Sequence, residues 1–462
     1  MQFNKMDLAD LRLFGTDGIR ARAGEFPLDD STVFTIGAAL GKVFSELLER
    51  SPRFVIGRDT RESGDQIRSA VCTGAASSGA ECEDAGVITT PGVAYITNRF
   101  DFDAGIVVSA SHNPFEDNGL KFFLPSGKKL DEKYERQIER HVFSSDQAVD
   151  LTRSRYVENS DNQDRFADSY LAHLLDRFDG SSLENLRIAV DCANGAAFQL
   201  APELLARLGA NVVLTNADPN GRNINLDCGS LHLEKLQKAV VDSRADIGVA
   251  FDGDADRVLF VDESGEIVDG DATVWIIAKQ LLSEGKLVNR KVVATVMSNI
   301  GLEIALAGIG VDLMRVNVGD KYVLEALLDS EAELGGEQSG HIIIPEIGLV
   351  GDGLMTMVYV LRAMRSTGLK LSKLASGFVR YPQVLLNVSV AEKRPFELVE
   401  RIATEKAAVE AELRGSGRLL LRYSGTENLA RVMIEGKDQA TIERQAHRLG
   451  AVIQNELGSV AG

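Results

Sequence analysis

The stretch GIVVSASHNPFEDNGLKFF, residues 105–123, is the one around which the chain is organised. The β-branched run Ile106–Val108 predicts a short buried strand, and Leu120–Leu124 predicts a second strand. Between them, Asn113-Pro114 and Asp117–Gly119 are interpreted as two turns. The stretch therefore predicts two stiff strands joined by polar loop residues.

Four chemically useful side chains lie on or beside these turns. They are the hydroxyl of Ser111, the imidazole of His112, the carboxylate of Asp117 and the ammonium of Lys121. Loops held by a rigid scaffold are where catalytic groups tend to lie. On these residues alone, a polar turn on the surface is an equally good interpretation.

Composition limits the classes of protein to which the chain can belong. It has 462 residues and a formal net charge of −18, which gives no basic field to attract nucleic acid or an anionic membrane. An anionic ligand must therefore be met by locally placed Arg and Lys. The four cysteines show no CxxC spacing, the N-terminus does not resemble a signal peptide, and no apolar run approaches ~18 residues. We expect a cytoplasmic protein.

A pattern of strand, polar loop, helix and strand occurs three times. In the first occurrence a strand at Phe54–Gly57 is followed by the loop RDTRESG, a helix over Gln66–Gly79 and a strand at Val87-Ile88. A helix over Ser31–Leu48, capped by Ser31, precedes it. The pattern repeats over 187–215 and again over 291–316. Three such units predict three related α/β domains with mainly parallel or mixed sheets covered by helices on both faces.

The pattern changes near the C-terminus. An alternating strand at Val384–Val390, a long helix over Pro395–Leu413, two strands and a final helix predict a smaller α+β domain. The charged segment Glu132–Asp164, which is poor in apolar runs, is expected to contain the first domain boundary, and the other two are expected near Asp262–Gly270 and Thr367–Leu374. The predicted domains are residues 1–157, 158–262, 263–371 and 372–462.

The segment FDGDADR, Phe251–Arg257, lies between two predicted strands. Asp252, Asp254 and Asp256 alternate, so an extended backbone would place their carboxylates on one side. Three close anions repel one another unless a cation lies among them, and hard oxygen ligands favour Mg²⁺. An EF-hand is rejected because its sixth position is Arg257 rather than Gly and its flanks read as strands.

Two further loops are candidates for binding a sugar phosphate. In GGEQSGH, Gly335–His341, alternating polar groups on a Gly-flanked turn can bind hydroxyls. In RYSGTENLAR, Arg422–Arg431, hydroxyls and a flexible backbone lie between two arginines, as a phosphate site requires. Ordinary surface turns remain the alternative for each loop alone.

Taken in order, FGTDGIR (14–20), SASHNP, DGDADR, GEQSGH and RYSGT resemble the α-D-phosphohexomutase superfamily. Five motifs in one order are far more specific than any one of them. Within that superfamily, the chain is most similar to the branch that interconverts glucosamine 6-phosphate and glucosamine 1-phosphate on the way to UDP-N-acetylglucosamine. The similarity lies in Gln338 of GEQSGH, in DCANGA at 191–196 and in VMSNIG at 296–301. Relatives that act on mannose or glucose phosphates more often carry Met at the position of Gln338, and they are the nearest alternative.

The resemblance implies four domains around a central cleft and a role for each loop. Ser111 would carry a phosphoryl group, and a phosphate oxygen there, with Asp252, Asp254 and Asp256, would hold Mg²⁺. The remaining implied roles fall into three groups: acid–base or electrostatic help from Lys121, His341 and His112; contacts to phosphate charge from Arg20 and Arg257; and substrate binding by Glu337, Ser339, Arg422, Ser424, Gly425, Thr426 and Arg431.

The resemblance also implies a reaction cycle through a phosphoserine enzyme and glucosamine 1,6-bisphosphate or a similar sugar bisphosphate, which serves as primer and intermediate. The expected partner is a small-molecule sugar phosphate, with no nucleic acid and no membrane, and a homodimer stays an open option. Two departures from the family pattern are Tyr423 and Asn428, which replace the prolines of RPSGTEP, and Ala21, which stands where Gly is usual. A serine-phosphate hydrolase and a non-enzymatic sugar-phosphate sensor are alternatives of other classes.

Overall fold

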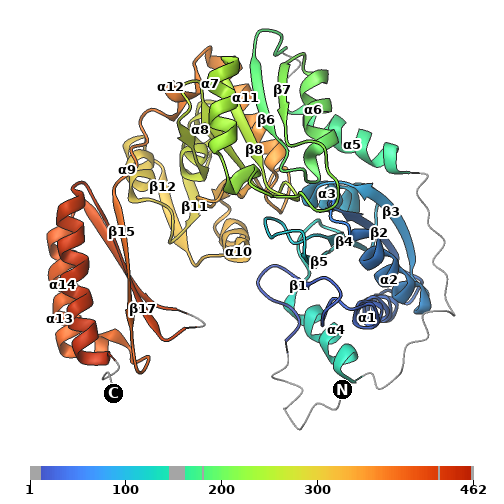
Figure 1. Cartoon of the computed structure of the whole chain (residues 1–462), viewed down its shortest axis with the longest axis horizontal. Helices are drawn as coiled ribbons and strands as arrows, with labels where there is room; N and C mark the ends of the chain where they lie inside the picture. The colour runs from blue at the N-terminus through green and yellow to red at the C-terminus, as the bar shows by residue number, and fades with distance from the viewer. Residues whose placement is uncertain (1–11, 145–161, 179–181, 425–426, 459–462) are drawn as a thin grey trace. The chain divides into compact units, whose positions relative to one another are not determined.

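The computed structural model describes residues 12–144, 162–178, 182–424 and 427–458. The chain divides into two compact units. The first joins Met1–Thr295 to Val316–Ala375, and the second joins Val296–Arg315 to Ser376–Gly462 (Figure 1). The first unit contains the first two predicted α/β domains and most of the third, while the second unit contains residues 296–315 together with the sheet of the predicted α+β domain. The predicted fold class is confirmed.

The first sheet holds the central stretch of the sequence analysis. Its strand order is β1-β5-β4-β2-β3, with β4 parallel to β2 and antiparallel to β5. All residues of β4 are buried, as the β-branched run predicts. The strands are β1 (Ile19–Arg22), β2 (Arg53–Arg58), β3 (Glu81–Val87), β4 (Ala104–Val108) and β5 (Asp117–Phe123), and the helices are α1 (Asp30–Leu48), α2 (Gly64–Ser77), α3 (Thr90–Arg99) and α4 (Glu132–Ser144).

Two local predictions in this domain are wrong. Asp117–Gly119 is not a turn but the start of β5, because it pairs with β1, where Arg20 lies opposite Gly119. Ser31 does not cap α1. The cap is Asp29, whose carboxylate accepts the N–H of Thr32 at 3.0 Å, while the Ser31 hydroxyl donates to the same carboxylate.

Helix α1 packs closely against α2. A Cβ at Gly37 would lie 2.0 Å from the carbonyl oxygen of Val71, so only glycine permits this approach of the two backbones. Among the described residues, α1 is the one helix long and apolar enough to cross a membrane by length and composition. Its residues Val33, Ile36 and Leu40 are buried in the core of the first domain instead.

The second and third sheets repeat the arrangement of the first. In each, a parallel strand ends in a loop and returns as an antiparallel neighbour: β4 to β5, β8 to β9 and β13 to β14. The SASHNP, DGDADR and GEQSGH loops therefore occupy equivalent positions, each at the carboxyl end of a parallel strand. The strands of these two sheets within the first unit are β6 (Arg187–Asp191), β7 (Asn211–Thr215), β8 (Ile247–Phe251), β9 (Val258–Asp262), β10 (Ile267–Val268), β11 (Lys291–Thr295), β13 (Leu334–Gly336) and β14 (Ile342–Ile343).

Helices pack against these two sheets, as α8 does against β9 and β13 and α11 does against β9. The helices are α5 (Gln163–Asp176), α6 (Ala197–Arg207), α7 (Glu234–Ser243), α8 (Gly270–Ser283), α10 (Asp320–Ser330), α11 (Gly353–Thr367) and α12 (Leu371–Ala375).

The second unit is an antiparallel sheet of order β15-β17-β16 with α13 and α14 packed side by side (Figure 1). Its elements are α9 (Ile300–Gly308), β12 (Asp312–Val316), β15 (Gln383–Ser389), α13 (Glu400–Leu413), β16 (Gly417–Tyr423), β17 (Leu429–Gly436) and α14 (Gln439–Leu457). The predicted helix from Pro395 is too long, because a 3₁₀ turn at Phe396–Leu398 precedes α13. The buried carboxylate of Glu435 ties the sheet to α9 by accepting the N–H of Ile300 at 3.2 Å.

Candidate active site

Ser111 lies in the loop that follows β4, and its side chain is held against the Asp252 carboxylate. Its Oγ donates to Asp252 Oδ2 at 2.6 Å and lies 3.2 Å from Nδ1 of His112. The residue is fully buried, and its φ of 53° is in the left-handed region that few non-glycine residues adopt. Such a backbone at a reactive side chain indicates a conformation imposed by its surroundings.

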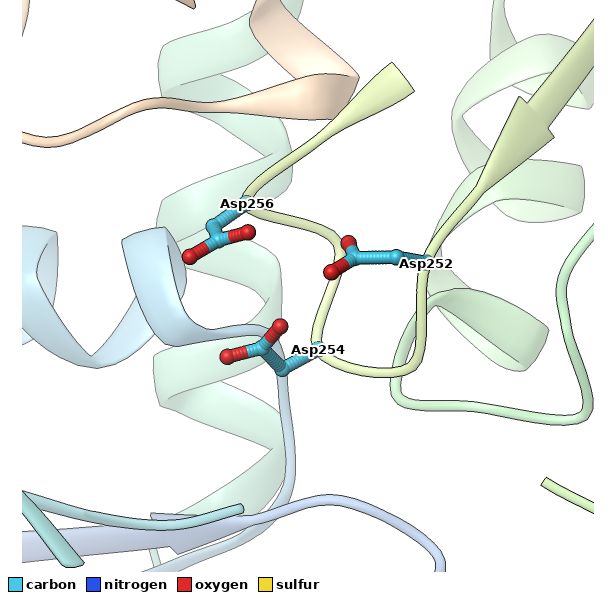
Figure 2. A group of neighbouring side chains, drawn as sticks. All are labelled: Asp252, Asp254 and Asp256. Atoms are coloured by element: carbon cyan, nitrogen blue, oxygen red, sulfur yellow. The ribbon is translucent and has the colours of Figure 1, made fainter. Parts of the chain in front are cut away.

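The three aspartates lie on the loop between β8 and β9, and their carboxylates converge (Figure 2). One oxygen of each lies within 4.8 Å of the others, and all three residues are buried. The predicted grouping is present, but the extended backbone proposed for it is wrong. The segment is a tight turn with Ala255 at a φ of 55°, because the antiparallel pairing of β8 with β9 forces the chain to reverse there.

The donor set of this cluster fits a divalent cation. Within the described part of the chain, Asp254 Oδ1 and Asp256 Oδ1 are buried and lack a hydrogen-bond partner. Burial, together with the charges of Asp256 and Asp254, raises the pKa of Asp252 well above its usual value. A cation would satisfy the free oxygens and relieve this repulsion, and an all-oxygen set favours Mg²⁺ over softer metals.

Lys121 on β5 is a buried cation among these carboxylates. Its Nζ lies 2.8 Å from Asp254 Oδ2, 3.3 Å from Asp256 Oδ2 and 3.2 Å from Asp17 Oδ2. Burial alone would lower the pKa of Lys121, but the three carboxylates outweigh burial and hold the pKa well above its usual value. The side chain is therefore a fixed ammonium, suited to stabilising negative charge. The hydroxyl of Thr90 also donates to Asp254 Oδ2, at 2.5 Å.

An ion-pair chain that the sequence analysis missed extends from Lys121. Asp17 pairs with Lys121, Lys129 and Arg20, and Lys129 pairs in turn with Asp320 on α10. Asp17 falls inside the FGTDGIR motif, so a search of that motif for carboxylates could have found it. Lys129 and Asp320 are far apart in sequence and carry no such signal.

A pocket of about 570 Å³ adjoins this cluster within the first unit. Arg20, His112 and Arg257 supply cationic or hydrogen-bonding groups on its wall. Arg257 Nη1 lies 3.2 Å from Nδ1 of His112, and because a guanidinium only donates, this nitrogen is the acceptor. Burial and the charges of Arg257 and Arg20 lower the pKa of His112 to about 4.

Glu337 and His341 line the same pocket from the loop between β13 and β14. Glu337 accepts the N–H of Gly319 at 3.2 Å and the Ser339 hydroxyl at 3.3 Å, so both members of the predicted sugar-binding pair are held together. His341 Nε2 accepts the N–H of Gly351 at 3.0 Å, while its Nδ1 lies 3.7 Å from Asp256 Oδ2.

The predicted phosphate loop belongs to the second unit. Arg422 on β16 lies directly opposite Arg431 on β17, and Arg431 pairs with the carboxylate of Glu427 at 3.2 Å. Arg431 donates to the Ser424 hydroxyl at 3.3 Å. Gly425 and Thr426, the other predicted members, lie outside the described residues.

Comparisons with known proteins agree along the whole chain. Profiles of the phosphoglucomutase/phosphomannomutase family match its α/β/α domain I at residues 11–149, domain II at 168–265, domain III at 269–381 and the C-terminal domain at 385–451.

Individual proteins match over nearly their full length. A phosphoglucosamine mutase of Solibacter usitatus is 47% identical, covering 96% of this chain and 99% of that protein. One from Acetivibrio thermocellus is 44% identical, covering 97% and 100%. The crystal structure of a phosphoglucomutase/phosphomannomutase family protein from Burkholderia thailandensis shares the fold, with a TM-score of 0.76 at 24% identity, covering 96% of this chain and 97% of that one.

Proposed function

Because the chain belongs to the phosphoglucomutase/phosphomannomutase family, among its phosphoglucosamine mutases, we propose that it interconverts glucosamine 6-phosphate and glucosamine 1-phosphate. It is an isomerase of the phosphohexomutase type. The observation that carries the proposal is the Ser111 hydroxyl, 2.6 Å from Asp252 and next to the buried aspartate triplet and Lys121. Binding a sugar phosphate would require neither a buried serine nor three converging carboxylates.

The reaction begins with a phosphoryl group on Ser111. Its bond to Ser111 Oγ breaks and a new bond forms to the free hydroxyl of the sugar monophosphate, which loses its proton and becomes a bisphosphate. Ser111 Oγ takes up a proton in place of the one that the sugar hydroxyl loses, and the restored hydroxyl keeps its hydrogen bond to Asp252 Oδ2. The bisphosphate turns end for end, and its other phosphoryl group returns to Ser111. Glucosamine 1,6-bisphosphate or a similar sugar bisphosphate is thus both intermediate and primer.

The cation site fits this chemistry. Asp252, Asp254 and Asp256, with a phosphate oxygen on Ser111, would hold Mg²⁺, and the bound ion would neutralise charge on the transferring phosphoryl group. Lys121 adds a fixed positive charge that needs no rearrangement during the transfer, and such preorganised charge is a large contribution to catalysis.

The remaining residues have proposed binding roles. Glu337 and Ser339 bind sugar hydroxyls, and Arg20 and Arg257 bind phosphate oxygens. His112 and His341 give acid–base or electrostatic help to the reacting groups, and the ring nitrogens of His341 face the N–H of Gly351 and the carboxylate of Asp256. The phosphate that is not reacting is bound by Arg422, Ser424, Gly425, Thr426 and Arg431. The enzyme is proposed to act in the cytoplasm, toward UDP-N-acetylglucosamine and cell-wall precursors.

Phosphorus NMR tests the proposal directly. Purified protein, Mg²⁺ and a trace of glucose 1,6-bisphosphate are incubated in parallel with glucosamine 6-phosphate, mannose 6-phosphate and glucose 6-phosphate. We expect the amino sugar to be converted fastest to its 1-phosphate. Faster conversion of mannose or glucose phosphate would identify a phosphomannomutase or phosphoglucomutase of the same mechanism, and release of inorganic phosphate would identify a hydrolase.

Ser111→Ala separates chemistry from binding. It is expected to abolish turnover while leaving sugar-phosphate affinity within about threefold, because the groups proposed to bind the sugar lie on other loops. Turnover at the wild-type rate in this variant would refute the phosphoserine mechanism.

A further inference from the structure

The loop RDTRESG after β2 contains a buried arginine that the proposed chemistry does not use. The guanidinium of Arg61 is fully buried in the first domain and pairs with the buried carboxylate of Asp59, with Nε 2.9 Å from Asp59 Oδ2. Its other four N–H groups all donate to backbone carbonyl oxygens of the Ser111 loop and of the first residue of β5. Nη2 donates to Ser111 at 3.0 Å and to Asn113 at 2.9 Å, and Nη1 donates to Asp117 at 2.9 Å and to Pro114.

Four further hydrogen bonds, two through Ser109 and two from Asn225, hold the same loop. Asp59 Oδ2 accepts the hydroxyl of Ser109 at 2.6 Å, and that hydroxyl accepts the Ser111 N–H at 2.9 Å. The Asn225 amide donates to the carbonyl oxygens of Ser111 and Asn113 at 2.8 and 3.0 Å. The carbonyl of Ser111 thus receives donors from two separate segments of the chain.

This arrangement explains how Ser111 keeps its unfavourable backbone conformation. A non-glycine residue at a φ of 53° persists only where its surroundings impose it. Arg61 and Asn225 bind the carbonyl of Ser111, so the rotation of the backbone is fixed and Oγ is directed toward Asp252. A guanidinium presents five donors in a rigid plane, and lysine cannot reproduce that geometry.

We propose that Arg61 is a positioning residue for the reaction, which holds the Ser111 backbone so that Oγ faces Asp252. The inference rests on the proposed function for its kinetic test. The arginine touches carbonyl groups of the nucleophile loop rather than substrate or the aspartate triplet. Its effect should therefore fall on the rate of phosphoryl transfer and not on sugar binding.

Arg61→Lys tests the proposal, because it keeps the charge that faces Asp59 and loses the planar donors. We expect kcat to fall about 100-fold, as a displacement of a reacting group by about 1 Å does, with KM for glucosamine 6-phosphate within about threefold. The matched control is Arg68→Lys. Arg68 is also buried in this domain and lies 3.2 Å from the buried carboxylate of Asp84, but on α2. Its kcat should stay within about twofold of wild type.

Hydrogen exchange supplies a readout that a purely structural role would not give. In Arg61→Lys, amide exchange should rise in the peptide covering 109–118 and stay unchanged in α1 and α2. Wild-type kcat in folded Arg61→Lys, or an equal loss of kcat in Arg68→Lys, would overturn the proposal. A rise in exchange across the whole domain would do the same.

A second variant decides the question if Arg61→Lys does not fold. Asn225→Asp keeps the shape and the tolerance for a positive φ at this position, but it replaces two donors with a carboxylate beside two carbonyl oxygens. We expect a similar loss of kcat and the same local rise in exchange, and no change in either would refute the clamp. If the wild-type protein itself converts no sugar phosphate, the proposed function fails, while the exchange data still decide whether the clamp holds the loop.

Discussion

The carboxyl group of Asp352 caps the N-terminus of α11, but its pKa is raised, whereas the pKa of a carboxyl group at a helix N-terminus is ordinarily lowered. It accepts the N–H of Met355 at 2.9 Å and the hydroxyl of Tyr170 at 2.7 Å. Burial outweighs these bonds and raises the pKa of Asp352 from 3.8 to about 6. The folded protein therefore binds this proton more tightly than the unfolded chain does. The stability that Asp352 contributes is present below about pH 4 and is lost as the pH rises through about 6.

The size of the effect follows from the two pKa values. A change from 3.8 to about 6 is close to two pH units, or about 3 kcal/mol. Asp352→Asn removes the titration and keeps an acceptor for Met355. The free energy of unfolding of wild type minus that of the variant should then fall by about 2.5 kcal/mol between pH 4 and pH 7.5, because part of the effect is already lost at pH 4.

Urea denaturation followed by fluorescence measures this difference, because the single tryptophan, Trp275 in α8, reports on the unit that contains Asp352. The matched control is Asp29→Asn at the cap of α1. Burial raises the pKa of Asp29, but hydrogen bonds from Ser31 and Thr32 outweigh it, so the pKa is lowered. Its stabilisation is present above pH 3.8 and is lost only as the pH falls, so the corresponding difference should not decline. A flat or rising difference for Asp352→Asn would refute the reasoning.

Three further predictions concern packing, the cation and the second unit. Gly37→Ala should lower the free energy of unfolding, measured in urea, by about 3 kcal/mol, because its Cβ would lie 2.0 Å from a backbone oxygen. The control Gly308→Ala has open space around it and should be neutral or raise that free energy by up to about 1 kcal/mol. Mg²⁺ should raise the melting temperature of wild type but not that of Asp254→Asn, and EDTA should abolish turnover. A wild-type melting temperature that does not change with Mg²⁺ would contradict the cation site. Asn299→Ala should lower the stability of the second unit by about 1–2 kcal/mol, because Asn299 Oδ1 accepts the N–H of Gly301 at 3.0 Å at the start of α9 and the N–H of Tyr381 at 2.9 Å. Faster amide exchange in α9 would report the loss, and unchanged exchange would contradict this role.

Much of the candidate site could be predicted from the sequence because its chemistry lies in short contiguous motifs. SASHNP, DGDADR and GEQSGH each follow a strand whose apolar run is visible in one dimension. The repeated strand–loop–helix pattern placed these loops in three similar domains, and the three sheets have the same connection at those points. The predicted domain boundaries and the roles of individual residues stay predictions.

The predictions of local backbone conformation were wrong where pairing with another strand decides that conformation. Asp117–Gly119 has the composition of a turn, yet it is strand because β1, nearly a hundred residues earlier, pairs with it. The aspartates alternate as in an extended chain, yet they lie on a turn because β8 and β9 are antiparallel neighbours. Hydrogen bonds between strands are not encoded in local periodicity, so no reading of the segment alone could find them.

The sequence by itself determined the kinds of chemical group available, the strands and helices with clear periodicity, and the family. Only the tertiary structure decided which charges meet. It placed Lys121 among three carboxylates, linked Asp17 through Lys129 to Asp320, and brought Arg61 against the backbone of Ser111. The reason is physical: a local motif fixes what a side chain can donate or accept, but burial and the partner's position set its charge and direction, and both depend on segments far apart in the chain.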